Sequence, residues 1–144
     1  MKLKIFYFFL ILTLTSIISS CGKSAESKII GTWNKISVGP DKNIGTWTFT
    51  ADHHLYINRI RITLNDDTLG IEQDTATWNI NLHTLRKNTL KIDQTNTQNS
   101  NIFPFTAGEF EIRELNDILV LQRVKLSNGE TDGAYAWHEF EKTK

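Results

Sequence analysis

The chain has one cysteine, two prolines and one methionine among its 144 residues. A single cysteine excludes a disulfide within the chain, so burial and hydrogen bonding must hold the fold. Its 16 basic and 16 acidic residues balance, so it lacks the positive charge with which proteins bind nucleic acid. A phosphate-binding glycine loop and the Gly-x-Ser-x-Gly turn of hydrolases are also missing. These absences argue against a nucleic-acid-binding protein and against common enzyme classes.

The one long apolar run lies at the N-terminus. Lys2 and Lys4 precede an almost unbroken apolar stretch at residues 5–18, which is the layout of a secretory signal peptide. The stretch has about 14 residues, fewer than the roughly 20 that a transmembrane helix requires. Residues 1–20 are therefore predicted to be a signal peptide rather than a membrane span.

The end of this segment, Ile18-Ser19-Ser20-Cys21, resembles the lipobox of bacterial lipoproteins. The resemblance implies that Cys21 is lipidated on sulfur and becomes an acylated N-terminus, carrying chains such as palmitate. Several acyl chains, at about 0.8 kcal/mol per buried methylene, anchor a protein stably to a membrane. Gly22 is not the aspartate of inner-membrane retention, so the resemblance favours the outer membrane of the cell envelope. An ordinary signal peptide with a chance cysteine is the alternative.

Without its signal peptide the chain has about 124 residues and a net charge of about −2, because two lysines leave with the signal. This length suffices for one domain with a real core. Residues 21–28 are small and polar beyond the cysteine, and we expect them to form a lipidated, flexible tether. Residues 29–142 are the predicted domain.

The domain alternates between apolar and polar residues in short segments bounded by turn residues, and it lacks a long helical period. We therefore expect an all-β fold of eight antiparallel strands. Only one connection, the polar segment 94–101, is long, which favours a small up-and-down barrel whose closure removes the sheet edges. An open β-sandwich is the alternative. The predicted strands are 29–38, 45–50, 55–64, 74–82, 89–93, 109–115, 118–126 and 134–141.

Two local patterns add detail to this prediction. In the third strand, Leu55 and Ile57 share one face while Ile60 lies on the other, and a slip of phase near Asn58 predicts a bulge or a bend. Between the sixth and seventh strands, residues 116–117 (Asn-Asp) predict a tight turn.

The tetrapeptide Ile-Gly-Thr-Trp occurs twice, at residues 30–33 and 44–47. The first copy, the lipobox, the eight-strand meander and a last strand ending in Trp-His-Glu-Phe-Glu-Lys together resemble the lipocalin-like (calycin-type) lipoproteins common in Bacteroidetes. The resemblance covers residues 29–142 and implies that Gly31 and Trp33 are the barrel signature, with the tryptophan plugging the closed end. Trp47 of the second copy is expected near the opposite end of the first hairpin.

The chain also departs from that family. There the plugging tryptophan commonly stacks with an arginine from near the end of the chain, whereas no arginine follows the eighth strand here. We expect Arg123 or Lys142 to cover Trp33 by a cation–π contact instead. The Thr-Asp-Tyr motif and the long C-terminal helix of secreted lipocalins are missing, so a bound ligand does not follow from the fold.

Aromatic residues in the predicted strands are the candidates for a ligand cup, because large rings line apolar pockets and Tyr and Trp add a polar group. Alternatively, these rings fill the core of a solid small barrel. The candidates are Trp47, Phe49, Tyr56, Trp78, Phe110, Tyr135 and Trp137.

No catalytic set is predicted. His53 and His54 share a turn, where two imidazoles can hold a metal, but two solvated side chains are the simpler interpretation. Glu109, Glu111 and Glu114 are expected on an outer face, and no carboxylate pair stands out as acid and base. We therefore expect neither an enzyme nor a resident metal or cofactor.

Two functions follow as hypotheses. In the first, the lipid-anchored barrel is a non-catalytic binding module for a small apolar ligand. In the second, a solid barrel acts through its surface, as a structural, inhibitor or immunity-type lipoprotein whose protein partner is unknown. A cavity open at one end favours the first, and an exposed apolar patch favours the second.

Overall fold

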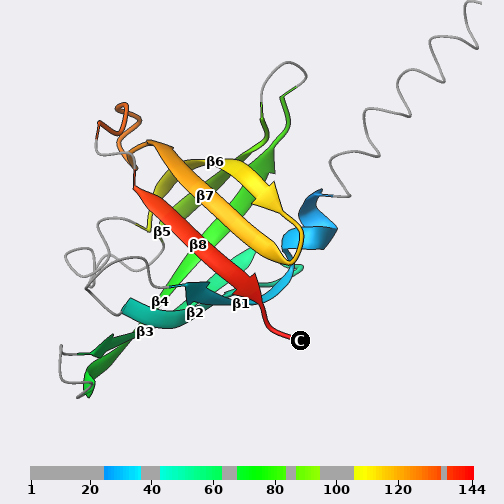
Figure 1. Cartoon of the computed structure of the whole chain (residues 1–144). Coiled ribbons are helices and arrows are strands. Elements are labelled where there is room, and N and C mark those ends of the chain that lie inside the picture. Colours follow the sequence, from blue (N-terminus) through cyan, green and yellow to red (C-terminus); the bar gives the residue numbers. More distant parts are fainter. Residues whose placement is uncertain (1–24, 37–42, 63–67, 84–86, 95–105, 134–135) are drawn as a thin grey trace, which may run out of the picture.

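The computed structural model describes residues 25–36, 43–62, 68–83, 87–94, 106–133 and 136–144. These residues form a closed barrel whose eight antiparallel strands follow sequence order (Figure 1). Each strand pairs with its neighbours along the chain, and β1 pairs with β8 to close the wall. The predicted up-and-down barrel is confirmed, and the alternative of an open sandwich is wrong. The strands are β1 (Gly31–Ile36), β2 (Asn43–Phe49), β3 (His54–Ile62), β4 (Thr68–Asn81), β5 (Thr89–Gln94), β6 (Gly108–Leu115), β7 (Ile118–Lys125) and β8 (Trp137–Lys142).

The predicted strand positions hold, and β4 shows the largest difference. It begins at Thr68, six residues before its predicted start, and pairs with the end of β3 in a long hairpin. The turn between β6 and β7 has two residues as predicted, and its Asn116 amide donates a hydrogen bond to the carbonyl of Ile118 (3.1 Å). Of the predicted polar connection at residues 94–101, only Gln94 belongs to the described residues.

The interior of the barrel is apolar over the half that contains the start of β1. Every strand contributes at least one buried apolar side chain to this core, and several are completely inaccessible to solvent. Burial of this kind, at about 25 cal/mol per Å² of apolar surface, is the main stabilising contribution to the fold. The core comprises Ile29, Trp33, Trp47, Phe49, Leu55, Ile57, Ala76, Trp78, Leu90, Ile92, Phe110, Leu119, Leu121 and Phe140.

A helical turn at residues 25–29 covers this end of the barrel and lies beside the end of β6 (Figure 1). Ile29 is fully buried, and its carbonyl accepts a hydrogen bond from the indole N–H of Trp33 (2.7 Å). Residues 25–28 were expected to belong to a flexible tether; they instead form this turn because Ile29 packs into the core. Within the described part of the chain, no helix is long and apolar enough to cross a membrane.

Lys142 covers the tryptophan at the closed end. Its Nζ lies 5.1 Å from the centre of the Trp33 ring and donates a hydrogen bond to the carbonyl of Lys28 (2.9 Å). The predicted cation–π contact is confirmed for Lys142. Gly31 has a φ of 129°, and its missing Cβ leaves room for the Lys142 side chain. Through Lys142, the last strand thereby contacts both the first strand and the helical turn.

The two Ile-Gly-Thr-Trp copies face each other across the first hairpin. Trp33 pairs directly with Trp47, and both side chains point into the barrel. The expectation that these tryptophans lie near opposite ends of the hairpin is wrong. The register pairs Gly31 with Phe49, which places the two indoles at the same level of the wall.

β3 runs through Asn58 without a change of register. Leu55 is fully buried, and the alternation continues to Ile60, which lies on the outer face. The predicted bulge near Asn58 is wrong, because the shift in register lies between Arg61 and Ile62.

Candidate functional site

The inner faces of the strands become charged toward the end of the barrel opposite the helical turn. β1 places Trp33 and then Lys35 on its inner face, and β3 places Ile57 and then Arg59 there. β4 follows the same pattern, with acidic residues in phase with its buried apolar ones. We call this region the charged end. It comprises Lys35, Arg59, Glu72, Asp74, Arg123, Asp132 and His138.

Lys35, Gly45 and Arg59 form one row across the first three strands. Gly45 and Arg59 are paired, and Lys35 follows the paired residues Asn34 and Thr46, so it lies opposite Gly45. A Cβ on Gly45 would overlap the backbone of β3 and lie only 3.0 Å from the Arg59 Cα. The glycine of the second tetrapeptide therefore permits a close approach of β2 to β3. It also leaves no side chain between the two cations.

The Lys35 ammonium group lies half-buried beside a second cation. Burial, followed by the repulsion of Arg59, lowers the pKa of Lys35 below its usual 10.5. Arg59 Nη1 lies 3.9 Å from Glu72 Oε2, and these two side chains are 32% and 19% exposed. Inward side chains with this exposure show that solvent reaches the barrel interior here, whereas Trp33 at the other end is fully buried.

Arg123 and Asp132 form a buried ion pair in the same region. The Arg123 Nε donates to Asp132 Oδ2 over 2.6 Å, and both side chains are 3% exposed. The same carboxylate oxygen accepts a hydrogen bond from the Ala136 amide (3.3 Å). The pair joins β7 to the connection that leads into β8. Arg123 is thus engaged here, and the alternative that it covers Trp33 is wrong.

His138 is the residue of the charged end that contacts the apolar core. It is 7% exposed, and its ring centre is 5.4 Å from that of Trp47, 5.8 Å from that of Phe110 and 6.2 Å from that of Phe140. A polar imidazole therefore forms part of an aromatic wall next to the inward cations. Aromatic rings and charged groups therefore follow one another along the inner faces of the strands.

Four of the seven predicted cup residues lie in the barrel interior: Trp47, Phe49, Trp78 and Phe110, all at most 4% exposed. Phe49 and Trp78 pack edge to face with their ring centres 5.5 Å apart. These contacts show that the rings fill much of the core, as the alternative interpretation held. Of the four, Trp47 and Phe110 contact His138 and so border the charged end.

The cup prediction is wrong for Tyr56 and Trp137. They lie on the outer face, 47% and 48% exposed, because strand alternation gives the inner positions to their neighbours. Tyr135 lies outside the described residues, as does Cys21 with the predicted signal peptide. Among the predicted outer acids, Glu109 and Glu111 pair with Lys125 and Arg113 (3.0 and 2.8 Å) on the outer wall.

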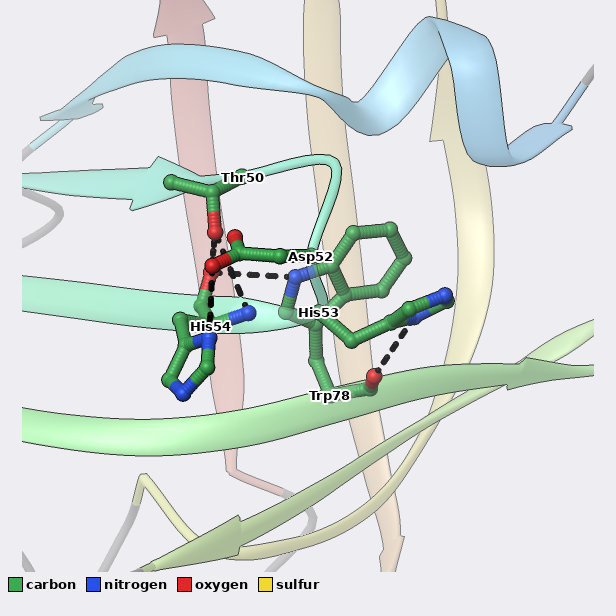
Figure 2. Close-up of polar contacts among 5 residues, drawn as sticks. All are labelled: Thr50, Asp52, His53, His54 and Trp78. Carbon is green, nitrogen blue, oxygen red and sulfur yellow. Dashed lines mark hydrogen bonds and ion pairs between the residues drawn. The ribbon is translucent and has the colours of Figure 1, made fainter.

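His53, in the turn between β2 and β3, and His54, the first residue of β3, make different contacts. His53, at a φ of 63°, has its Nδ1 3.1 Å from the carbonyl oxygen of Trp78, while the His54 Nδ1 lies 3.1 Å from Asp52 Oδ2. Figure 2 shows the imidazoles pointing away from each other. A hydrogen bond from Thr50 is the main cause that lowers the pKa of Asp52. In the described ranges, no group of three or more His, Cys, Asp and Glu side chains is placed to hold a metal ion.

Sequence reasoning missed the charged end, although the signal was present. With Leu55 and Ile57 on the inner face, strict alternation puts Arg59 there as well, and the assumed bulge at Asn58 hid this consequence. Asp74 is likewise in phase with the buried Trp78.

Comparison with known proteins adds no relative. No protein-family model, no curated protein and no solved structure matches the chain. A ligand can therefore be inferred only from the chemistry of the site, since a barrel fold alone does not specify one.

Proposed function

We propose that this chain is a non-catalytic binding module of the bacterial cell envelope. A lipid on Cys21 anchors it to a membrane, for which the outer membrane is the favoured candidate. The lipobox and the resemblance to lipocalin-like lipoproteins support the anchor and the location. The charged end of the barrel takes one small ligand with an apolar body and one anionic group. The sequence alone suggested an apolar ligand, and the charged end adds a negatively charged group to that proposal.

The row of Lys35, Gly45 and Arg59 carries this proposal. Two cations held together in a half-buried place repel each other, and the lowered pKa of Lys35 records part of that repulsion. An anion bound between them relieves the repulsion and accepts charge-assisted hydrogen bonds from both. In this environment each such bond is stronger than in bulk water.

The aromatic wall supports an apolar body for the ligand. Trp47 and Phe110 each contact His138 on the core side of the inward cations. Deeper in the barrel, Trp33 and Leu55 are fully buried in the packed core, which limits how far a ligand enters. The site therefore suits a compact amphipathic molecule better than a long acyl chain.

A binding role is proposed rather than a catalytic one because the two buried carboxylates of the site, Asp74 and Asp132, already accept hydrogen bonds. Asp132 accepts hydrogen bonds from Arg123 and from the Ala136 amide, and Asp74 Oδ1 accepts one from the Thr75 amide (2.8 Å). A general base must instead be free to take a proton from a substrate.

Two fluorescent probes test the proposal: anilinonaphthalene sulfonate and its neutral relative N-phenylnaphthylamine. Binding is measured to the full chain in nanodiscs, with empty nanodiscs as the blank. Hydrogen bonds to a charged group contribute about 1.5–3 kcal/mol, so we expect the sulfonate to bind roughly 10- to 100-fold more tightly. Arg59→Gln should abolish this preference, and Arg113→Gln, on the outer wall, should leave it intact. Equal binding of both probes by the unmodified chain would contradict an anion site.

A second candidate, a protein that acts through its surface, is favoured by exposed side chains on the outer wall. Ile44, Tyr56 and Ile71 are 39%, 47% and 67% exposed on β2, β3 and β4. These side chains point away from the barrel interior, so a surface function is compatible with a ligand at the charged end. Association with a protein is measured by sedimentation, and Arg59→Gln should not alter it.

A further inference from the structure

The outer wall of the first four strands has an unusual composition. We call this surface the uncharged face and define it as the even-numbered residues in 32–36, 44–48 and 54–60 and the odd-numbered residues in 71–79. These positions alternate with the inward ones and carry no Asp, Glu, Lys or Arg side chain. Threonine, asparagine, glutamine and isoleucine dominate, with Tyr56 and His54 on β3.

Cross-strand contacts hold the side chains of this face in register. Ile60 pairs with Ile44 on one side and with Ile71 on the other, which makes a row of three isoleucines across β2, β3 and β4. The hydroxyls of Thr32 and Thr48 lie 3.0 Å apart, which continues the ordered surface onto β1. Ordered side chains lose little conformational entropy when a partner covers them.

The opposite outer wall differs in charge. Its ion pairs join Lys91 to Asp93 on β5, Lys125 to Glu109 across β7 and β6, and Arg113 to Glu111 on β6. A solvated wall in a soluble domain normally has this character. The uncharged face thus departs from the rest of the molecule.

We propose that the uncharged face is the contact surface for a second copy of this chain in a two-fold symmetric dimer. Protein interfaces are depleted of charge at their centre and surrounded by a charged rim, and the strand next to β4 carries the Lys91–Asp93 pair of such a rim. A charged partner would lose hydration on this face without gaining a counter-charge.

A second copy of the chain is a partner whose surface composition is known, because it carries the same uncharged face. Among the described residues of a second chain, the surface that likewise carries no Asp, Glu, Lys or Arg is the same face. Self-association through one patch requires that like charges do not meet across the two-fold axis, and this face satisfies the requirement. In the dimer the exposed Ile71 and Tyr56 become buried. In other complexes, the residues that dominate binding are buried at the interface in the same way.

Two matched pairs of variants test the dimer, with sedimentation velocity of the full chain in density-matched detergent as the measurement. Tyr56→Ser removes an aromatic side chain from the uncharged face, and Trp137→Ser removes one of equal exposure from the charged wall (47% and 48%). Gln73→Glu adds one negative charge to the uncharged face on β4, and Gln122→Glu adds the same charge on β7.

We expect a dimer for the unmodified chain. Tyr56→Ser and Gln73→Glu should each raise its dissociation constant at least roughly tenfold, as loss of a central interface contact does. Trp137→Ser and Gln122→Glu should change it less than about twofold. Circular dichroism and thermal midpoints control for folding. The proposal is overturned if the unmodified chain stays monomeric up to about 0.1 mM, a concentration that detects even weak dimers, or if the two control variants weaken the dimer equally.

Discussion

The two halves of the barrel wall place their charged residues on opposite sides. In β1–β4 the described charged side chains, Lys35, Arg59, Glu72 and Asp74, face the interior, and the outer surface has none. In β5–β8 most charged side chains face solvent in ion pairs, and the inward exceptions that the structure describes in those strands are Arg123 and Lys142, which covers Trp33.

This difference separates charges that keep a protein soluble from charges that serve a site. Exposed ion pairs contribute about 0–1 kcal/mol each, so the outer wall of β5–β8 gains solubility more than stability. Inward charges lose hydration and persist where a partner or a ligand compensates for that loss. In the proposed function, β1–β4 accept a less stable interior in exchange for the proposed ligand site.

Breaking the buried ion pair gives the largest expected effect. Asp132→Ala leaves Arg123 buried without its carboxylate, and we expect the free energy of unfolding to fall by about 3–5 kcal/mol. Glu111→Ala removes the partner of Arg113 from an exposed pair and should cost less than about 1 kcal/mol. Denaturant unfolding followed by tryptophan fluorescence measures both. Similar losses in the two variants would show that the inner and outer charges are equivalent.

The close approach of β2 and β3 gives the next largest effect. A methyl group on Gly45 has no room against the backbone of β3, so Gly45→Ala should destabilise the fold by about 1–3 kcal/mol, as overpacking does. Gly70→Ala is the matched control, because nothing lies within 4 Å of its Cβ position. The variant should also separate Lys35 from Arg59 and weaken anion binding. An unchanged stability of Gly45→Ala would mean that the strands can move apart freely.

Much of the fold could be predicted because strand alternation and turn residues are local signals. The segments that became β5, β6 and β7 carry clean alternation and short turns, and their predicted bounds agree with the structure to within one residue. Registers are not local, however. The pairing of Trp33 with Trp47 depends on the connection between β1 and β2, which the residue pattern does not determine.

The candidate site was predicted only in part, for a physical reason. The rule that apolar residues face inward located Trp47 and Phe110 correctly, and the same rule turned attention away from Arg59 and Asp74. A ligand site is where a fold departs from that rule. The departure becomes visible once the strand phase is followed through β3 without a bulge.

Removing the Lys35 charge gives the smallest effect and the sharpest pH dependence. The lowered pKa of Lys35 means that its ammonium form destabilises the fold at neutral pH. Lys35→Met keeps the length of the side chain, and we expect it to raise the free energy of unfolding by about 0.5–2 kcal/mol at pH 7, while anion binding is lost. Sites that bind ligands often show this exchange of stability for function.

The advantage of Lys35→Met should shrink as the pH rises. Between the lowered pKa of Lys35 in the folded state and its usual 10.5 in the unfolded state, the unfolded chain binds the extra proton. The unmodified protein therefore gains stability with rising pH in this window, while the variant does not. Unfolding curves of both proteins across this pH window give the difference between their free energies of unfolding. The contributions of the other titrating groups are the same in both proteins and cancel in this difference. A pH-independent gap between Lys35→Met and the unmodified protein would mean that the charge of Lys35 is not what costs stability.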